Sequence, residues 1–151
     1  MTVTDSEPKS APIVVGIDGS PASINALRWA ACYATSIAGA VEVVVVWDWY
    51  RSPGWYTPIL AGLDPEGDAQ HVLEKALAEL DSEWPQLSVT SRVVEGRPAP
   101  ILTEASKNAS MLVVGCRGHG EFVGMVLGSV SEYCATHAHC PVLVYREHAA
   151  E

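Results

Sequence analysis

The chain has 151 residues, enough for one domain with a substantial core, and 48% of them are hydrophobic, which excludes global disorder. Its formal net charge of −9 argues against a surface that attracts nucleic acid. No apolar run approaches the roughly 20 residues of a membrane helix, and the polar first twelve residues lack the order of a secretory signal. We therefore expect a cytoplasmic protein that binds neither nucleic acid nor a membrane.

The chain holds four cysteines and no C-x-x-C pair, so we expect reduced thiols. Two of the cysteines, in Cys116-x2-His119 and Cys134-x2-His137, imitate the ligand spacing of a zinc site. The second pair lies on a predicted helix whose apolar face it helps to form, and buried cysteine commonly acts as a small hydrophobe. We favour structural cysteines over zinc.

The chain begins with a polar segment, residues 1–11, that predicts a mobile tail. Residues 13–17 form an apolar, mostly β-branched run closed by Asp18-Gly19-Ser20, which predicts a strand covered on both faces. Ser20-Pro21 then supplies a helix cap and a proline at the first helical position. The helix is expected to reach about residue 38 and end at Gly39. Its predicted buried stripe is Ile24, Leu27, Ala31, Ala34 and Ile37.

Residues 41–47 predict a second strand, parallel to the first and joined to it by a right-handed crossover. The next segment, residues 48–58, is rich in aromatic residues and proline and is too irregular for a helix. Its Trp49, Trp55 and Tyr56 either lie over a bound base or a partner's groove, or cap the edge of the sheet. We favour the edge, because loop aromatics usually pack locally.

The second half of the chain continues the alternation of helices and strands. Helices are predicted at about residues 66–84 and 129–137, and strands at 87–95, 111–115 and 141–145. Residues 96–100 are expected to turn the chain into a short helix that holds Ile101, Leu102 and Ala105. The strand at 87–95 alternates in polarity, so we place it half exposed at an edge of the sheet. Five strands alternating with four helices predict an α/β fold, a doubly wound parallel sheet with helices on both faces. Its ligand crevice is expected where the strand order reverses.

A glycine-rich loop joins the fourth strand to the last helix, with four glycines between positions 115 and 124. Glycine lets a backbone approach a ligand closely, and a helix N-terminus offers unpaired N–H groups to an anion. The spacing is Gly115-x2-Gly118-x9-Gly128-Ser129. Because the chain is acidic, local backbone donors would have to hold any phosphate. The alternative is a surface turn before a helix that Ser129 and Glu132 close as a capping box.

Three segments of the chain resemble the universal stress protein family. Residues 13–20 resemble its first strand with a terminal aspartate, residues 115–129 its nucleotide motif, and residues 140–144 its final strand. The resemblance covers residues 12–146, with the domain at 12–147 and a short tail at 148–151. It implies strand order 3-2-1-4-5, a crevice between the first and fourth strands, and ATP binding, because the glycine motif is complete. The loop departs from the family's commonest form at Cys116-Arg117, where small or polar residues are frequent. This departure would change affinity, or make the site sensitive to oxidation if Cys116 is exposed.

The resemblance also implies which residues hold the nucleotide. Asp18 would contact the ribose or help to hold a magnesium ion, although aspartate is also an ordinary turn residue. Arg117 and His119 either pair with the anion or point into solvent. The residues after the loop would give backbone N–H groups and a hydroxyl. The adenine pocket is assigned to Gly16, Ile17 and Val46, and the phosphate site to Gly115, Arg117, Gly118, His119, Gly128, Ser129 and Val130.

The sequence favours a binding protein over an enzyme. It has no G-x4-G-K-S/T phosphate loop, and no second carboxylate or lysine is obviously placed beside Asp18 to support hydrolysis. We predict an ATP-binding regulatory or stress-response protein that is not an enzyme. The alternatives are a binder of cyclic AMP or AMP, or a slow ATP hydrolase. The resemblance suggests that two chains pair along the apolar fifth strand as a homodimer, which would cover an exposed edge.

Overall fold

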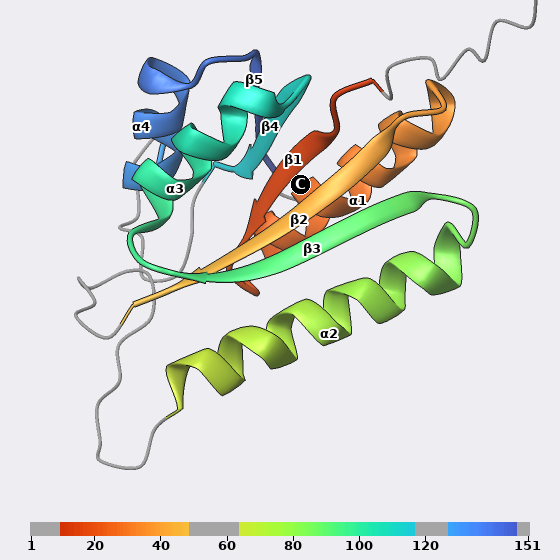
Figure 1. Cartoon of the computed structure of the whole chain (residues 1–151), viewed down its shortest axis with the longest axis horizontal. Coiled ribbons are helices and arrows are strands. Elements are labelled where there is room, and N and C mark those ends of the chain that lie inside the picture. Colours follow the sequence, from red (N-terminus) through yellow and green to blue (C-terminus); the bar gives the residue numbers. More distant parts are fainter. Residues whose placement is uncertain (1–9, 49–63, 117–126, 148–151) are drawn as a thin grey trace, which may run out of the picture.

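The computed structural model describes residues 10–48, 64–116 and 127–147, in which a single sheet of parallel strands is flanked by helices (Figure 1). The strands are β1 (Ile13–Ile17), β2 (Ala40–Trp47), β3 (Ser88–Glu95), β4 (Met111–Gly115) and β5 (Val142–Tyr145). The helices are α1 (Pro21–Ser36), α2 (Pro65–Glu83), α3 (Pro98–Ala105) and α4 (Ser129–His137), and a short 3-10 helix, η1 (Ser106–Asn108), follows α3. The strand order β3-β2-β1-β4-β5 confirms the predicted topology.

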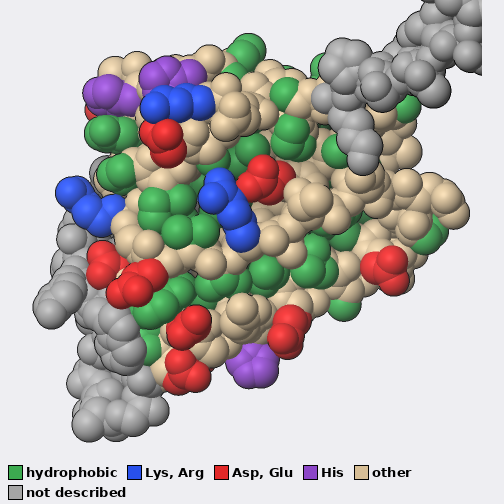
Figure 2. Space-filling view, viewed as in Figure 1, with side chains coloured by type: hydrophobic (Ala, Val, Ile, Leu, Met, Phe, Trp, Pro, Cys, Tyr) green, Lys and Arg blue, Asp and Glu red, His purple; other side chains and the backbone are tan. Residues whose placement is uncertain are grey.

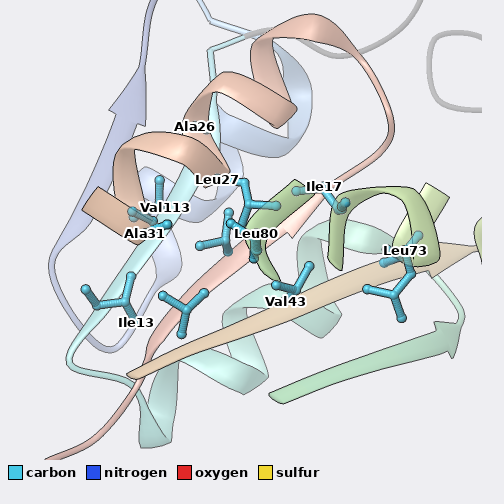
Figure 3. Packing of buried hydrophobic residues seen from close by; sticks show 14 of the residues in the cluster. Ile13, Ile17, Ala26, Leu27, Ala31, Val43, Leu73, Leu80 and Val113 are labelled. Carbon is cyan, nitrogen blue, oxygen red and sulfur yellow. The ribbon is translucent and has the colours of Figure 1, made fainter. Parts of the chain in front are cut away.

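Side chains that alternate along the strands build one apolar cluster on each face of the sheet. On β1, Ile13, Val15 and Ile17 join the cluster under α1 and α2, whereas Val14 joins the cluster under α3 and α4. Figure 3 shows the first cluster, with strand side chains packed against those of the two helices. The central strands are therefore buried on both faces, which explains their continuous apolar sequences.

Helix α1 ends earlier than the sequence predicts. Its last helical residue is Ser36, and Ala38, rather than Gly39, takes the positive φ of 53°. The Gly39 N–H donates to the Ala34 carbonyl at 2.8 Å, the bonding of a Schellman motif. The helix thus ends one residue before Ile37, the last residue of the predicted buried stripe. Ile37, predicted to be buried, is 52% exposed.

The two outer strands differ in how they are covered. β3 is paired with β2 alone, and its residues are partly or fully exposed, as predicted for an edge. Its Arg92 donates to Glu42 of β2 at 2.7 Å across the sheet. β5 is paired with β4 alone, and its four residues are partly buried. Both ends of the sheet are therefore open edges within the described residues.

The view in Figure 2 shows acidic side chains gathered over α2, in keeping with the net charge of the chain. Among residues 10–48, 64–116 and 127–147, no helix combines the length and the apolar character that crossing a membrane requires.

Candidate functional site

The strand order reverses between β1 and β4, and these two strands part at their carboxyl ends. Their pairing stops at Val15 and Val113, before either strand ends, whereas β1 and β2 remain paired as far as Ile17 and Val45. The helices that follow β1 and β4 cover opposite faces of the sheet. This is the position at which open parallel sheets bind ligands.

A hydrogen-bonded turn follows β1. Asp18 Oδ1 accepts from the Ser20 N–H at 2.8 Å, and the Asp18 N–H donates to Ser23 Oγ at 3.2 Å. Gly19 has a φ of +83°, which a side chain would strain. Ser20 then caps α1, its Oγ accepting from the Ser23 N–H at 3.3 Å. Asp18 is thus a turn residue, and its contact with a ribose or a magnesium ion stays a prediction.

Two of the predicted site glycines permit close packing. A Cβ on Gly115 would lie 3.1 Å from the backbone C of Ala22 and N of Ser23, because the first turn of α1 lies against the end of β4. A Cβ on Gly16 would lie 2.6 Å from Leu102 Cδ1 of α3. Both glycines therefore have a structural reason beside any contact with a nucleotide.

The other two residues assigned to the adenine pocket face opposite sides of the sheet. The Ile17 side chain is fully buried in the cluster under α1 and α2, where Figure 3 places it with Val43 and Leu73. Val46 is 3% exposed and belongs to the cluster under α3 and α4. Only the backbone of Ile17 is therefore available on the side that Val46 faces.

The start of α4 differs from the predicted capping box. The helix begins at Ser129, so the N-cap is Gly128, which has no side chain with which to close the helix. The Gly128 N–H donates to the Cys116 carbonyl at 2.7 Å, so it already has an acceptor within the chain, and its predicted contact with a nucleotide stays a prediction. Ser129 is exposed and Val130 partly so, and no described residue accepts from their N–H groups. The amides of Ser129 and Val130 are thus donors at a helix start with no acceptor among the described residues, the kind of position at which anions bind.

All the residues described at this edge of the sheet fall within a match to a known protein family. Residues 10–146 match the family model described as "Universal stress protein family". The chain belongs to the universal stress protein family. The complete glycine motif and the aspartate after β1 thus belong to a universal stress protein domain.

Curated relatives agree with this assignment. Universal stress protein Rv2623 of Mycobacterium tuberculosis is 35% identical over 140 residues, which are 93% of this chain and 46% of the relative. Universal stress protein Rv2005c of the same organism is 36% identical over 141 residues, 93% of this chain and 47% of the relative. The chain therefore spans about half the length of these relatives.

Solved structures agree as well. A universal stress protein in complex with cAMP is 25% identical, with a TM-score of 0.65, over 89% of this chain and 94% of that one. A universal stress protein family member from Burkholderia pseudomallei is 26% identical, with a TM-score of 0.64, over 94% of this chain and 98% of that one.

Sequence reasoning missed Ser131 of this universal stress protein domain. Its side chain is 2% exposed, and Oγ donates to the carbonyl oxygens of Cys116 and Gly128, each at 3.0 Å. The available signal was a hydroxyl in the first turn of a helix directly after the glycine motif.

The hypothesis that Cys116 makes the site sensitive to oxidation requires an exposed thiol. Cys116 is only 6% exposed, so this requirement is not met.

Several predicted features lie outside the described residues. These are Arg117, Gly118 and His119 of the glycine loop and the aromatic residues Trp49, Trp55 and Tyr56.

Within the part of the chain that the structure describes, no three His, Cys, Asp or Glu side chains gather as a metal site would require. Burial raises the pKa of Cys134 to about 11, which opposes the thiolate that zinc needs.

Proposed function

We propose that this universal stress protein domain binds ATP at the carboxyl edge of the sheet, with the phosphates at the start of α4. The observation that carries the proposal is that Ser129 and Val130 offer N–H groups without a side-chain cap, directly after the glycine motif. Such a helix start attracts anions through its unpaired amides and its dipole. The related structure solved with cAMP supports an adenine nucleotide as the ligand.

The local donors matter because the chain as a whole repels phosphate. Its net charge is −9, and Glu132 lies in the first turn of α4 itself. A phosphate group would therefore be held by short-range N–H contacts against an unfavourable mean field. Arg117 of the loop is proposed to add positive charge at the same position, and His119 to pair with the anion by a hydrogen bond.

The nucleoside is proposed to lie where β1 and β4 part. Val46, at the end of β2, faces the α3 and α4 side there, and Gly16 gives the backbone of β1 no side chain on that side. Asp18 is proposed to contact the ribose and to share a magnesium ion that arrives with the nucleotide. The complete glycine motif favours ATP over cyclic AMP or AMP, because it allows the loop to close on several phosphates.

Calorimetric titration with ATP, cyclic AMP, AMP and adenosine tests this proposal. We expect ATP, with or without Mg²⁺, to bind, and adenosine to bind at least about tenfold more weakly because it lacks the anion that the helix start attracts. Mass spectrometry of small molecules released from denatured protein identifies the nucleotide carried from cells. No bound nucleotide together with no heat from any of the four ligands would overturn the proposal.

We further propose that the bound nucleotide is not turned over. Hydrolysis requires a group that orients water, usually with a protein-held metal ion, and Asp18 Oδ1 is engaged in the turn after β1. An assay of ATP over many turnovers should give no product above a protein-free control. Sustained product release that disappears in Asp18→Ala would make the protein an enzyme instead.

A homodimer through β5 is proposed to cover the open edge of the sheet. Residues Val142–Tyr145 are only partly buried and pair on one side with β4, which leaves the other side of the strand to a second chain. Light scattering should give the mass of two chains at micromolar concentration. A monomer under those conditions would contradict the proposal.

A cytoplasmic location also stays a prediction from the sequence.

A further inference from the structure

The hydroxyl of Ser131 joins the two ends of the glycine loop. It is buried, and its single proton is shared between the carbonyls of Cys116, just after β4, and of Gly128, the N-cap of α4, both 3.0 Å from Oγ. The Gly128 N–H donates to the same Cys116 carbonyl at 2.7 Å. The Cys116 oxygen thus accepts from two donors that both belong to the start of α4.

These bonds fix the start of α4 on the sheet. The Cys116 N–H donates to the Tyr145 carbonyl at 2.8 Å, so Cys116 is itself held at the end of β5. The Gly128 carbonyl accepts from the Glu132 N–H at 2.9 Å in addition to Ser131. Both peptide groups of the N-cap are therefore bonded. The next residues along the chain, Ser129 and Val130, carry the amides assigned to the phosphate.

We propose that Ser131 is a positioning residue for phosphate binding. This inference rests on the proposed function. The side chain is buried beneath the helix start, and its donor is used by Cys116 and Gly128, so it acts through the backbone rather than on the ligand. Preorganised donors lose effect when they are displaced by about 1 Å. The hydroxyl keeps the N–H groups of Ser129 and Val130 oriented toward the bound anion.

A matched pair of serine substitutions tests this role. Ser106 is a second buried serine that joins two segments, because its Oγ donates to the Thr103 carbonyl and accepts from the His139 N–H at 2.8 Å. It lies in η1, between α3 and β4, and not at the glycine loop. Ser131→Ala and Ser106→Ala each remove one buried hydroxyl, so both should lower stability in denaturant unfolding.

Nucleotide affinity should separate the two variants. We expect Ser131→Ala to bind ATP roughly five- to tenfold more weakly, with adenosine affinity, measured by competition, changed less than about twofold. Ser106→Ala should keep both affinities within about twofold of the unsubstituted chain. ATP affinity that is unchanged in Ser131→Ala, or that falls together with adenosine affinity, would overturn the positioning role.

Hydrogen exchange of the Gly128 amide without nucleotide gives an outcome that does not depend on ligand binding. This N–H is bonded to Cys116, the acceptor that Ser131 shares. We expect exchange at least about fivefold faster in Ser131→Ala and unchanged exchange in Ser106→Ala. If the unsubstituted chain binds no adenine nucleotide, the proposed function fails, and this measurement still decides whether Ser131 orders the start of α4. Unchanged exchange in Ser131→Ala would refute it.

Discussion

Helices α1 and α4 both start at the carboxyl edge of the sheet, after the neighbouring strands β1 and β4, yet their first turns are satisfied in opposite ways. At α1, Pro21 has no N–H to satisfy, and the Ser20 hydroxyl accepts from the Ser23 N–H. At α4, the N-cap is Gly128, and no side chain closes the turn. The leading N–H groups of a helix can thus be satisfied by its own chain or be left open to an anion.

The other two described α-helices resemble α1 in having fewer leading N–H groups left open. The Asp64 carboxylate caps α2 by accepting from the Gly67 N–H at 2.9 Å. Helix α3 has prolines at its first and third positions, Pro98 and Pro100, so two of its leading residues carry no N–H. Among the described α-helices, α4 is thus the one whose first turn has neither a side-chain cap nor a proline.

The largest expected effect concerns the contact between the first turn of α1 and the end of β4, the strand that precedes α4. Gly115→Ala places a Cβ 3.1 Å from backbone atoms of Ala22 and Ser23, which cannot rotate away, so we expect a loss of about 2 kcal/mol in the free energy of unfolding. Gly39→Ala is the control, because its Cβ would lie 3.3 Å from the exposed, flexible Ile37 side chain. Denaturant unfolding measures both. Equal losses would show that α1 does not press on the end of β4.

The second effect removes one open amide from α4. Ser129→Pro deletes the N–H at the first helical position, where proline is tolerated, and the extended Gly128 (φ −72°, ψ 165°) suits a following proline. We expect ATP affinity to fall at least about tenfold, or about 1.4 kcal/mol, with little change in stability. Ser129→Ala keeps the amide and should lose less affinity. Calorimetry in which Ser129→Pro binds ATP like the unsubstituted chain would remove this amide from the site.

The third effect acts on the closed helix start. Ser20→Ala removes the cap of α1 and should lower the free energy of unfolding by about 1 kcal/mol. ATP affinity should stay within about twofold, because Ser20 is used within the chain. If Ser20→Ala lowers only stability and Ser129→Pro lowers only ATP affinity, the start of α1 serves the fold and the start of α4 serves binding. Weakened ATP binding in Ser20→Ala would instead extend the nucleotide site to α1.

The smallest expected effect separates cysteines on the same two helices. Cys134 of α4 is fully buried, and burial raises its pKa from 9.0 to about 11, although the Thr103 hydroxyl opposes part of this shift. The unfolded chain loses this proton first, so the stability contribution is complete below pH 9 and is lost as pH rises through about 11. At pH 10 the loss should be up to about 1 kcal/mol.

The check is urea unfolding at pH 8 and pH 10. Cys134→Val should show a smaller drop in stability between these two conditions than the unsubstituted chain. Cys32→Val, at an exposed position on α1, should keep the original drop. Equal pH dependence in all three proteins would mean that the Cys134 thiol titrates alike in the folded and unfolded chains.

The sequence predicted most of the fold because its signals are local. The strand at β1 and the cap and proline at the start of α1 lie in adjacent residues, where apolar period and backbone bonding determine the outcome. The end of α1 was less well predicted. Gly39 was the expected left-handed residue, but the terminal hydrogen bonds place Ala38 in that conformation and leave Ile37 exposed.

The succession of strands and helices along the chain, the capped start of α1 and the spacing of the glycine motif can all be read from the amino-acid sequence, because each depends on residues close together in the chain. The packing of Gly115 against α1 and the hydrogen bond from the Gly128 N–H to Cys116 are visible only in the folded chain. The same holds for the hydrogen bonds by which Ser131 joins the ends of the loop. These contacts join elements distant in sequence, so they exist only once the sheet has brought those elements together.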